Sequence, residues 1–345
     1  MFRKLFAKKP LPKVFIPEAD IAFDVGRNET VLEAALKAGF AYPHDCTVGT
    51  CGSCRSRLLA GKVDAITPFG YTLSREELQA GYILACQAVP ESDLQLEVPL
   101  GQAERTKVTG RIVAHKPLTH DIRVVTWEVS APVSYRAGQY MSLTWPGAPG
   151  ARSYSFCNAP GKDGRTLLSA FVRRVPGGAF TEALFSGALD DVAFEIEAPH
   201  GTFWLRDGDG PILLVGGGSG LSPLMSLLED AADRGVRRDV VLLFGGRAER
   251  DLYCLDEIAA LAGRWQGRFE FWPVLSEEAG EGWRSGMVTA EIPAALAQLG
   301  NVGAAQAYLC GPPAMIDAGV AALAAAGVAL SAIFYDKFTD AGTGR

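Results

Sequence analysis

Cysteines with the spacing of metal ligands are the residues of this chain best suited to chemistry. The segment CTVGTCGSC places Cys46, Cys51 and Cys54 in one nine-residue loop, and Cys86 follows in GYILACQA. The pattern C-x4-C-x2-C…C is the plant-type spacing for the thiolate ligands of a [2Fe-2S] cluster. Because such a cluster exchanges electrons singly, the spacing predicts one-electron transfer.

A structural zinc site is the competing interpretation, because four cysteine thiolates also form a closed tetrahedral site. Zinc sites usually present two separate C-x2-C knuckles, whereas three thiols here share one loop and the fourth stands alone. Gly49 and Gly52 give the loop backbone freedom and N–H groups that can point at sulfur. The spacing favours the cluster, and a non-catalytic protein with a four-cysteine zinc module stays the alternative.

A glycine-rich turn after an apolar run is a second candidate site. PILLVG leads into GGGSGLSP, and a helix is predicted from about Leu221 to Ala232. Such a turn presents N–H groups and the positive end of a helix dipole to a pyrophosphate. We expect a dinucleotide here, although Leu221 stands where the G-x-G-x-x-G fingerprint has its third glycine. The residues expected to bind it are Gly217, Gly218, Ser219, Gly220, Leu221, Ser222 and Pro223.

The elements that must position these residues change character along the chain. Strands over 13–16 and 21–25 and a helix over 29–38 precede the cysteine loop. Short runs rich in Val, Ile, Phe and Thr then predict a small six-stranded antiparallel barrel. Near-continuous apolar runs alternating with helices predict an open parallel α/β sheet in the last third. The predicted divisions are a basic tail over 1–12, an α+β unit over 13–101, a β-barrel over 105–207 and an α/β domain over 208–345.

Composition and charge narrow the class of protein. The 345 residues are 48% hydrophobic, and no apolar run reaches the ~18 to 20 residues of a membrane span. We therefore expect a cytoplasmic protein that does not bind membranes. The formal net charge of −6 argues against nucleic acid as a partner. Residues 14–100 carry six basic and twelve acidic side chains, so we expect an acidic face near the cysteine loop to dock a partner.

Four motifs in order resemble one known family. RSYS (152–155), VPGGAFT (175–181), GGGSGLSP and CGPPAM (310–315) follow one another as in the ferredoxin-NADP reductase superfamily. With a plant-type ferredoxin ahead of them, the chain is similar to the reductase components of multicomponent bacterial oxygenases. The resemblance covers almost the whole chain. It implies a β-grasp ferredoxin domain, a FAD-binding barrel, and a nucleotide-binding domain whose C-terminal tail lies near the flavin.

The resemblance implies a flavin site on the RSYS strand. Arg152 would pair with the FAD pyrophosphate, since a planar guanidinium suits phosphate oxygens. Tyr154 would stack on the isoalloxazine, and the Ser155 hydroxyl would approach N5, the atom that accepts hydride. The turn after Arg173 would hold the other side of the diphosphate at a helix N-terminus. The implied FAD-binding residues are Arg152, Ser153, Tyr154, Ser155, Val172, Arg173, Gly177, Gly178, Ala179, Phe180 and Thr181.

The resemblance also implies where the nicotinamide meets the flavin. It places Cys310 beside the two rings, where the thiol helps them approach and is not a covalent nucleophile. Asp336 and Phe338 in the tail IFYDKFT would lie by the flavin face, although many relatives carry Glu at the acidic position. The implied catalytic residues are Tyr154, Ser155, Cys310, Asp336 and Phe338, and further nucleotide-binding residues are Gly246, Arg247, Cys310, Gly311, Pro312 and Phe338.

The combined sites predict an electron relay. A nicotinamide gives up two electrons as hydride while a cluster takes one, so FAD must stand between them. Arg247 suits a 2′-phosphate, but Glu249 and Asp251 would repel it, which favours NADH over NADPH. We expect a monomer that passes electrons from NADH to FAD, to the [2Fe-2S] cluster, and to a terminal Rieske, di-iron or haem oxygenase or its ferredoxin. A relay serving a non-oxygenase acceptor, such as a deoxysugar dehydrase, is the alternative.

Overall fold

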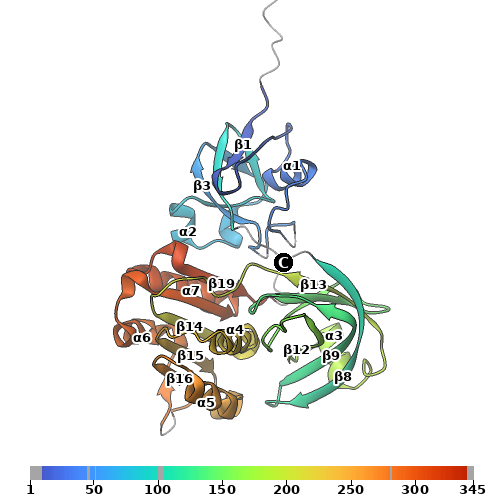
Figure 1. Cartoon of the computed structure of the whole chain (residues 1–345), viewed down its shortest axis with the longest axis vertical. Helices are drawn as coiled ribbons and strands as arrows, with labels where there is room; N and C mark the ends of the chain where they lie inside the picture. The colour runs from blue at the N-terminus through green and yellow to red at the C-terminus, as the bar shows by residue number, and fades with distance from the viewer. Residues whose placement is uncertain (1–9, 45–46, 51, 100–104, 280–281, 340–345) are drawn as a thin grey trace, which may run out of the picture. The chain divides into compact units, whose positions relative to one another are not determined.

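The computed structural model describes residues 10–44, 47–50, 52–99, 105–279 and 282–339. The chain forms two compact units, residues 1–102 and residues 103–345. The first unit ends at residue 102, between the predicted end of the α+β unit at residue 101 and the predicted start of the barrel at residue 105. The predicted barrel and the predicted parallel sheet lie together in the larger unit, and the ferredoxin-like sheet forms the smaller one (Figure 1).

The smaller unit has the mixed sheet of a β-grasp fold, as expected. Its strand order is β2-β1-β7-β3-β5, in which β1 and β7 are parallel and the other pairs antiparallel. Helix α1 begins two residues later than predicted, because the Thr30 hydroxyl accepts from the Glu33 N–H and the Glu33 carboxylate accepts from the Thr30 N–H. The elements are β1 (Lys13–Ile16), β2 (Ile21–Asp24), α1 (Val31–Lys37), β3 (Arg55–Ala60), β4 (Val63–Ala65), α2 (Arg75–Gln79), β5 (Tyr82–Leu84), β6 (Ala88–Pro90) and β7 (Leu94–Glu97).

The first part of the larger unit is a nearly closed barrel of six antiparallel strands. The strand order is β11-β10-β13-β8-β9-β12, and a bridge between Phe156 and Ala170 joins the two ends. Inward residues such as Val125, Trp127 and Val129 alternate with more exposed ones and fill the interior. The elements are β8 (Thr106–Pro117), β9 (Ile122–Val133), β10 (Tyr140–Thr144), β11 (Arg152–Ser155), β12 (Arg165–Arg173), α3 (Ala179–Phe185) and β13 (Phe194–His200).

The second part is an open sheet in which every pair of neighbouring strands is parallel. Its order is β17-β16-β15-β14-β18-β19. Helices α4 and α5 pack on one face, and α6 and α7 pack on the other. The elements are β14 (Ile212–Gly217), α4 (Leu221–Asp233), β15 (Val240–Gly246), α5 (Leu255–Arg264), β16 (Phe269–Leu275), β17 (Arg284–Ser285), α6 (Ile292–Leu299), β18 (Gln306–Gly311), α7 (Pro313–Ala325) and β19 (Ile333–Lys337).

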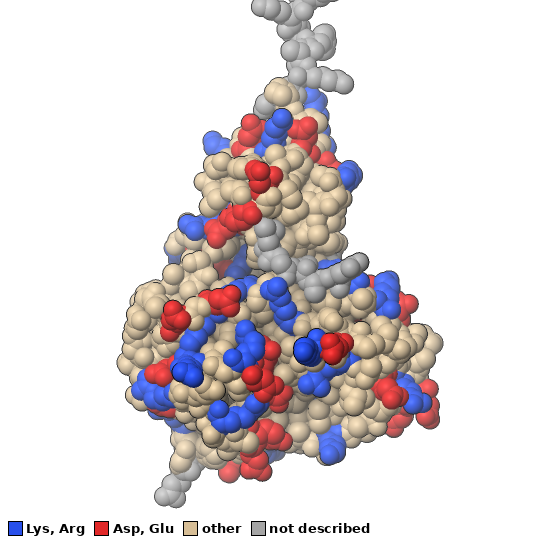
Figure 2. Space-filling view, in the orientation of Figure 1, with Lys and Arg blue, Asp and Glu red and all other residues tan. Residues whose placement is uncertain are grey.

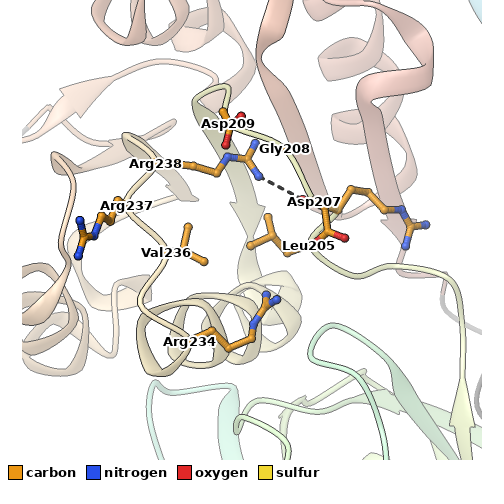
Figure 3. Close-up of a pocket in the computed structure, with 9 residues that line it drawn as sticks. Leu205, Asp207, Gly208, Asp209, Arg234, Val236, Arg237 and Arg238 are labelled. Atoms are coloured by element: carbon orange, nitrogen blue, oxygen red, sulfur yellow. Dashed lines mark hydrogen bonds between the residues drawn. The ribbon is translucent and has the colours of Figure 1, made fainter.

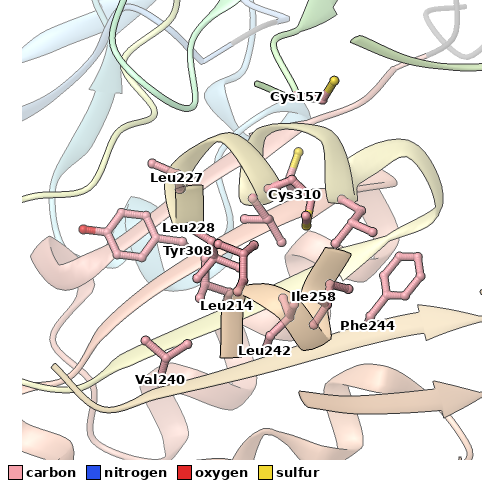
Figure 4. Close-up of a cluster of buried hydrophobic side chains, with 14 of the residues drawn as sticks. Cys157, Leu214, Leu227, Leu228, Val240, Leu242, Phe244, Ile258, Tyr308 and Cys310 are labelled. Atoms are coloured by element: carbon pink, nitrogen blue, oxygen red, sulfur yellow. The ribbon is translucent and has the colours of Figure 1, made fainter. Parts of the chain in front are cut away.

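Barrel and sheet share one hydrophobic core along α4. Phe171 and Cys157 of the barrel belong to the same buried cluster as Leu224 and Leu228 of α4 and Cys310 of β18. Figure 4 shows Cys157 and Cys310 on the same side of this cluster, close to the helix. The barrel strands and the sheet are therefore held in a fixed relation within the larger unit. None of the helices in the described ranges is long and apolar enough to cross a bilayer.

Candidate functional site

Two of the four predicted cluster ligands come together in the smaller unit. Cys54 precedes β3 and Cys86 follows β5, and these strands pair with Arg55 opposite Leu84. Both thiols are buried, at 2% and 5% exposure, and their sulfur atoms lie 3.3 Å apart. Two unbridged sulfur atoms at this separation fit ligands that converge on one metal centre. Cys46 and Cys51 lie outside the described residues, so their part in the cluster stays a prediction.

The cysteine loop is braced by two side chains from elsewhere in the unit. The Gln87 amide donates to the Thr47 carbonyl at 3.3 Å and lies 3.8 Å from the Cys86 sulfur. The Thr72 hydroxyl donates to the Gly49 carbonyl. Gly49 has φ +83°, and a Cβ there would lie 2.8 Å from Cγ of Gln87, so glycine is required on both grounds. The loop is thus shaped around the thiols, as a cluster site needs.

Some of the side chains near the cysteine loop are apolar and exposed. Val48, Ile66 and Tyr71 are 62%, 62% and 81% exposed, and each adjoins a residue that binds the loop or is part of it. Glu77 is buried and pairs with Arg55, so it contributes no exposed negative charge. Asp45, which adjoins the loop, lies outside the described residues, and Asp64 is exposed near Ile66, so the predicted acidic face stays a prediction.

The RSYS strand, β11, is the first strand in the order of the barrel sheet. Its Tyr154 ring, which is predicted to stack on the flavin, is partly exposed. β11 pairs with β10 so that Tyr154 faces Met141 and Ser155 faces Tyr140. The Tyr154 ring rests on Trp127, with centroids 6.4 Å apart, and on Phe180, at 5.1 Å. This backing fixes the ring and leaves its outer part for a planar ligand, which fits an isoalloxazine. Sequence reasoning did not find Trp127, because an alternating barrel strand marks it only as core.

Arg152 fits the predicted phosphate contact. Its guanidinium donates to the carbonyl oxygens of Gly150 and Ala151, at 3.2 and 2.9 Å, within its own loop. Among the described residues no carboxylate pairs with Arg152. A guanidinium without a carboxylate partner on a ligand-binding edge suits phosphate oxygens.

Arg173 and the turn after it are held by polar contacts within the barrel. Arg173 pairs with Asp121 at 2.8 Å, and this contact lowers the pKa of the Asp121 carboxyl despite the opposing effect of burial. The Thr181 hydroxyl accepts from the Val175 N–H at 3.1 Å. These contacts fix the turn, formed by Gly177, Gly178, Ala179, Phe180 and Thr181, at the start of α3. A helix of seven residues such as α3 has only a small dipole. That the turn and Arg173 bind the FAD diphosphate therefore stays a prediction.

Ser155, Cys310 and Asp336 converge although they are far apart in the sequence. The Ser155 hydroxyl donates to the Asp336 carboxylate at 3.3 Å across 181 residues. Asp336 in β19 stands directly opposite Cys310 in β18. The Phe338 N–H donates to the Gly311 carbonyl at 2.9 Å, which ties the tail to the end of β18. The structure thus brings these three predicted catalytic residues together, and the Phe338 side chain packs against the buried cluster that includes Cys310.

Burial explains the state of the Cys310 thiol. The residue is fully buried, and desolvation, followed by the charge of Asp336, raises its pKa well above the ordinary value. A thiol in this environment stays protonated and neutral. The expectation that Cys310 is not a nucleophile agrees with this direction, since the thiolate is the reactive form.

The glycine turn after β14 packs directly against the end of β18. A Cβ at Gly220 would overlap the carbonyl oxygen of Cys310, so only glycine permits this approach. The buried Tyr253 hydroxyl donates to the Gly218 carbonyl at 2.8 Å and fixes the turn from the other side. Tyr253 is a residue that the sequence did not mark, because nothing local distinguishes it from core. The turn therefore brings the predicted phosphate site within contact of the CGPP segment.

Not every residue of GGGSGLSP is available to a nucleotide. Leu221, Ser222 and Pro223 are all buried. The Ser222 hydroxyl accepts from the Phe171 N–H at 3.1 Å and donates to the Ser155 carbonyl at 2.7 Å. Its side chain therefore binds the barrel, and its direct contact with a nucleotide is not supported by this geometry.

The loop after β15 carries the groups predicted to distinguish the two nicotinamide nucleotides. The Asp251 carboxylate accepts from the N–H groups of Arg247 and Ala248, both at 3.1 Å. The Arg247 side chain lies 3.8 Å from the same carboxylate. The Glu249 N–H donates to Glu278 at 2.7 Å, which adds a further carboxylate. One carboxylate therefore lies beside the Arg247 side chain and a second lies at the N–H of nearby Glu249. Gly246 is the last residue of β15, directly before Arg247.

A cavity of about 320 Å³ lies at the amino ends of strands β14 and β15 of the parallel sheet (Figure 3). It is lined by the segments just before β14 and β15, whereas the glycine turn follows the carboxyl end of β14. Arg238 donates to the carbonyls of Gly210 and Arg206, and Arg234 pairs with Asp230 at 2.9 Å. Arg238 therefore ties the segment between barrel and sheet to the segment before β15, whereas the Arg234 contact stays within one helix. Because the cavity lies at the amino ends of β14 and β15 and the glycine turn at the carboxyl end of β14, we do not assign the nucleotide to the cavity. Figure 2 shows basic and acidic side chains mixed on the visible face of the larger unit.

Comparisons with known families match each part of the chain. Residues 14–91 match the 2Fe-2S iron-sulfur cluster binding domain. Residues 109–204 match the oxidoreductase FAD-binding domain, and residues 214–320 match the oxidoreductase NAD-binding domain. The predicted [2Fe-2S], FAD and NAD-binding sites are therefore confirmed at the level of domains, and the zinc module is excluded.

Relatives match over nearly their whole length. The electron transfer component of xylene/toluene monooxygenase from Pseudomonas putida is 40% identical, covering 97% of this chain and 95% of that protein. The reductase subunit of an aromatic O-demethylase from an Amycolatopsis species is 36% identical, with 92% and 96% covered. The crystal structure of an Amycolatopsis cytochrome P450 reductase superposes with TM-score 0.71 at 35% identity, over 95% and 99% of the two chains. The chain thus belongs to the iron-sulfur flavoprotein reductases that are the electron-transfer components of oxygenase systems.

Proposed function

We propose that this reductase oxidises NADH and delivers electrons singly to the terminal oxygenase of a multicomponent monooxygenase. The observation that carries the proposal is the convergence of Ser155, Cys310 and Asp336 where the RSYS strand meets the nucleotide turn. In the cluster domain, the sulfur atoms of Cys54 and Cys86 lie 3.3 Å apart without a disulfide bond. Bound FAD supplies the conversion between two-electron hydride chemistry and single-electron transfer.

We assign the chain's residues three tasks at the flavin. Tyr154, supported by Trp127, provides the surface on which the ring stacks. The Ser155 hydroxyl holds a proton at Oγ, and the Asp336 carboxylate orients that hydroxyl by accepting its hydrogen bond. The neutral, buried Cys310 excludes water from the place where the nicotinamide would lie.

The remaining sites hold phosphates. We assign the FAD diphosphate to Arg152 and to the turn at Gly177 to Thr181, with Arg173 beside it. The nucleotide diphosphate is assigned to the turn Gly217 to Gly220. Gly218 has a positive φ, and Gly220 lets the turn pack against the Cys310 main chain. Gly311 and Pro312 then close the site beside Cys310.

The nucleotide preference follows from the loop after β15. Because Asp251 lies beside Arg247 and Glu278 binds the neighbouring Glu249 N–H, a 2′-phosphate would meet negative charge. We therefore expect kcat/KM for NADH to exceed that for NADPH at least ~10-fold, which corresponds to ~1.4 kcal/mol. Replacing Asp251 with Asn should narrow the ratio by raising kcat/KM for NADPH. A wild-type preference for NADPH would contradict the assignment.

The acceptor is inferred from the relatives. Xylene/toluene monooxygenase and an aromatic O-demethylase are the systems named for two of them, so a monooxygenase acting on an aromatic compound is the first partner to test. We place the protein in the cytoplasm, where NADH is available.

A reconstitution experiment tests the relay and its acceptor. The holoprotein is mixed anaerobically with NADH, and the flavin and cluster absorbance are followed; both should bleach. Substrate hydroxylation is then measured after adding the candidate oxygenase component. Absence of NADH-dependent bleaching would refute the relay, whereas transfer to a deoxysugar dehydrase and to no oxygenase would establish the alternative acceptor.

A further inference from the structure

Helix α4 carries three polar side chains on the face that meets the barrel. Ser222, Ser226 and Glu229 are spaced by four and three residues, so they lie along one side of the helix. The rest of the inner surface is apolar and belongs to the shared core. Buried polar groups are costly unless they form hydrogen bonds, so their partners reveal what the face does.

Each of the three side chains binds the main chain of the segment that continues the RSYS strand. Ser222 donates to the Ser155 carbonyl at 2.7 Å, and Ser226 donates to the Asn158 carbonyl at 2.7 Å. Glu229 accepts from the Ala159 N–H at 3.1 Å. The three contacts form a line that fixes α4 against residues 155–159.

Ser222 differs from the other two because its hydroxyl has two main-chain partners on different strands. It donates to Ser155 of β11 and accepts from the Phe171 N–H of β12 at 3.1 Å. The two strands meet at this point, where Phe156 bridges Ala170. The residue is 1% exposed, so water cannot replace the hydroxyl. If Ser222 loses its hydroxyl, the buried main-chain carbonyl of Ser155 loses this hydrogen-bond donor.

We propose that Ser222 is a positioning residue for hydride transfer, which locks the flavin-binding strand to the helix that begins at the nucleotide turn. The inference rests on the proposed function of β11 and of the glycine turn. Ser222 follows the turn by two residues, and its partner Ser155 is the residue assigned to the flavin edge. Its hydrogen bond thus joins the two cofactor sites through one side chain. Ser226 makes the same kind of bond one helical turn farther from both sites, and serves as the matched control.

Three proteins are compared as FAD-loaded and cluster-loaded holoproteins: wild type, S222A and S226A. Flavin reduction by NADH is followed anaerobically by stopped flow, with NADH and with NADH deuterated at the transferred hydrogen. FAD affinity, apparent Tm and the long-wavelength absorbance of the stacked nicotinamide and flavin are measured on the same samples. The last three readouts separate positioning from a general loss of stability.

We expect S222A to retain FAD and to lose somewhat more Tm than S226A, because the Ser222 hydroxyl has two main-chain partners and the Ser226 hydroxyl has one. Its flavin reduction should slow about 10- to 100-fold, because small displacements of reacting groups have effects of this size. The stacking absorbance should weaken only in S222A, while S226A should reduce its flavin within about twofold of wild type. Equal rates in S222A and S226A would overturn the inference.

Two outcomes need separate treatment. If S222A fails to retain FAD, the S222C variant is measured instead, because a thiol fills a similar volume and is a weaker hydrogen-bond donor. Flavin reduction that is slower in S222C than in S226A supports the inference. Equal rates of flavin reduction in the two variants overturn it. If wild type itself shows no flavin reduction by NADH, the proposed function fails, and the inference fails with it.

Discussion

The cluster site and the hydride-transfer site differ in how their residues are brought together. Three predicted cluster ligands fall within nine residues, and the fourth is delivered by the neighbouring strand β5. Ser155 and Asp336 meet across 181 residues, one from the barrel strand β11 and the other from β19 of the parallel sheet. The first site depends on a short loop and a few contacts, whereas the second depends on the packing of barrel, helix and sheet. The two sites should therefore respond differently to substitution.

The largest effect is expected from removing a cluster ligand. In C86S, serine oxygen is a poor substitute for a soft thiolate, so the cluster should be lost or unstable. Cluster absorbance and cytochrome c reduction should disappear, while reduction of FAD by NADH should continue, because the hydride-transfer site uses none of these residues. C254S is the control, since Cys254 belongs to the larger unit and not to the cluster domain. Normal cytochrome c reduction by C86S would break the comparison.

An intermediate effect is expected from disturbing the packed site. In G220A the added Cβ would overlap the Cys310 carbonyl oxygen, so the turn and β18 must separate. Overpacking of this kind lowers stability by ~1 to 3 kcal/mol. The displaced turn should also lower kcat/KM for NADH by up to ~100-fold, because small displacements of reacting groups have effects of this size. The cluster absorbance should stay unchanged.

Gly263 provides the matched control for this substitution. It lies within α5, and a Cβ there would have no neighbour within 4 Å. G263A should therefore leave NADH kinetics unchanged and raise stability slightly, since alanine favours the helix by ~1 kcal/mol. Equal kinetics in G220A and wild type would show that the close approach of turn and strand is not needed.

The smallest effect is expected at the far end of the α4 contacts. Burial raises the pKa of Glu229, which means that the folded protein binds this proton more tightly than the unfolded chain does. The stability associated with Glu229 is then fully present below its unfolded pKa of ~4.3 and falls as pH rises through the folded pKa. E229Q cannot lose a proton, so its apparent Tm should exceed that of wild type at pH 7 by at most ~2 °C.

The direction of the Tm change in E229Q distinguishes the removal of a buried charge from the loss of a hydrogen bond. The gain in E229Q should vanish near pH 4, where wild-type Glu229 is protonated. Glu182 supplies the opposite case, because its hydrogen bonds with Arg174 lower the pKa of its carboxyl. E182Q should therefore not stabilise at pH 7. A lower Tm for E229Q at every pH would mean that the charged hydrogen bond to Ala159 outweighs the cost of burial.

Several of the predictions from sequence hold because they depend on short-range order. The antiparallel barrel and the parallel sheet follow from the period of apolar residues, and the β-grasp sheet agrees with the family resemblance. Only details such as the start of α1 at Val31 differ. The convergence of Ser155, Cys310 and Asp336 agrees with the family resemblance, although no periodicity predicts it. Ser222 was expected to bind nucleotide, yet its hydroxyl binds two barrel strands.

The sequence alone determined the cluster spacing, the glycine turn and the order of the three domains, because each is set by residues close together along the chain. Only the tertiary structure decided what Trp127, Tyr253 and Ser222 do. Each has a partner that is distant in sequence, or packs in a core where nothing local marks its role. Such contacts depend on which strands and helices pack together, and the residues around each position carry no signal of that choice.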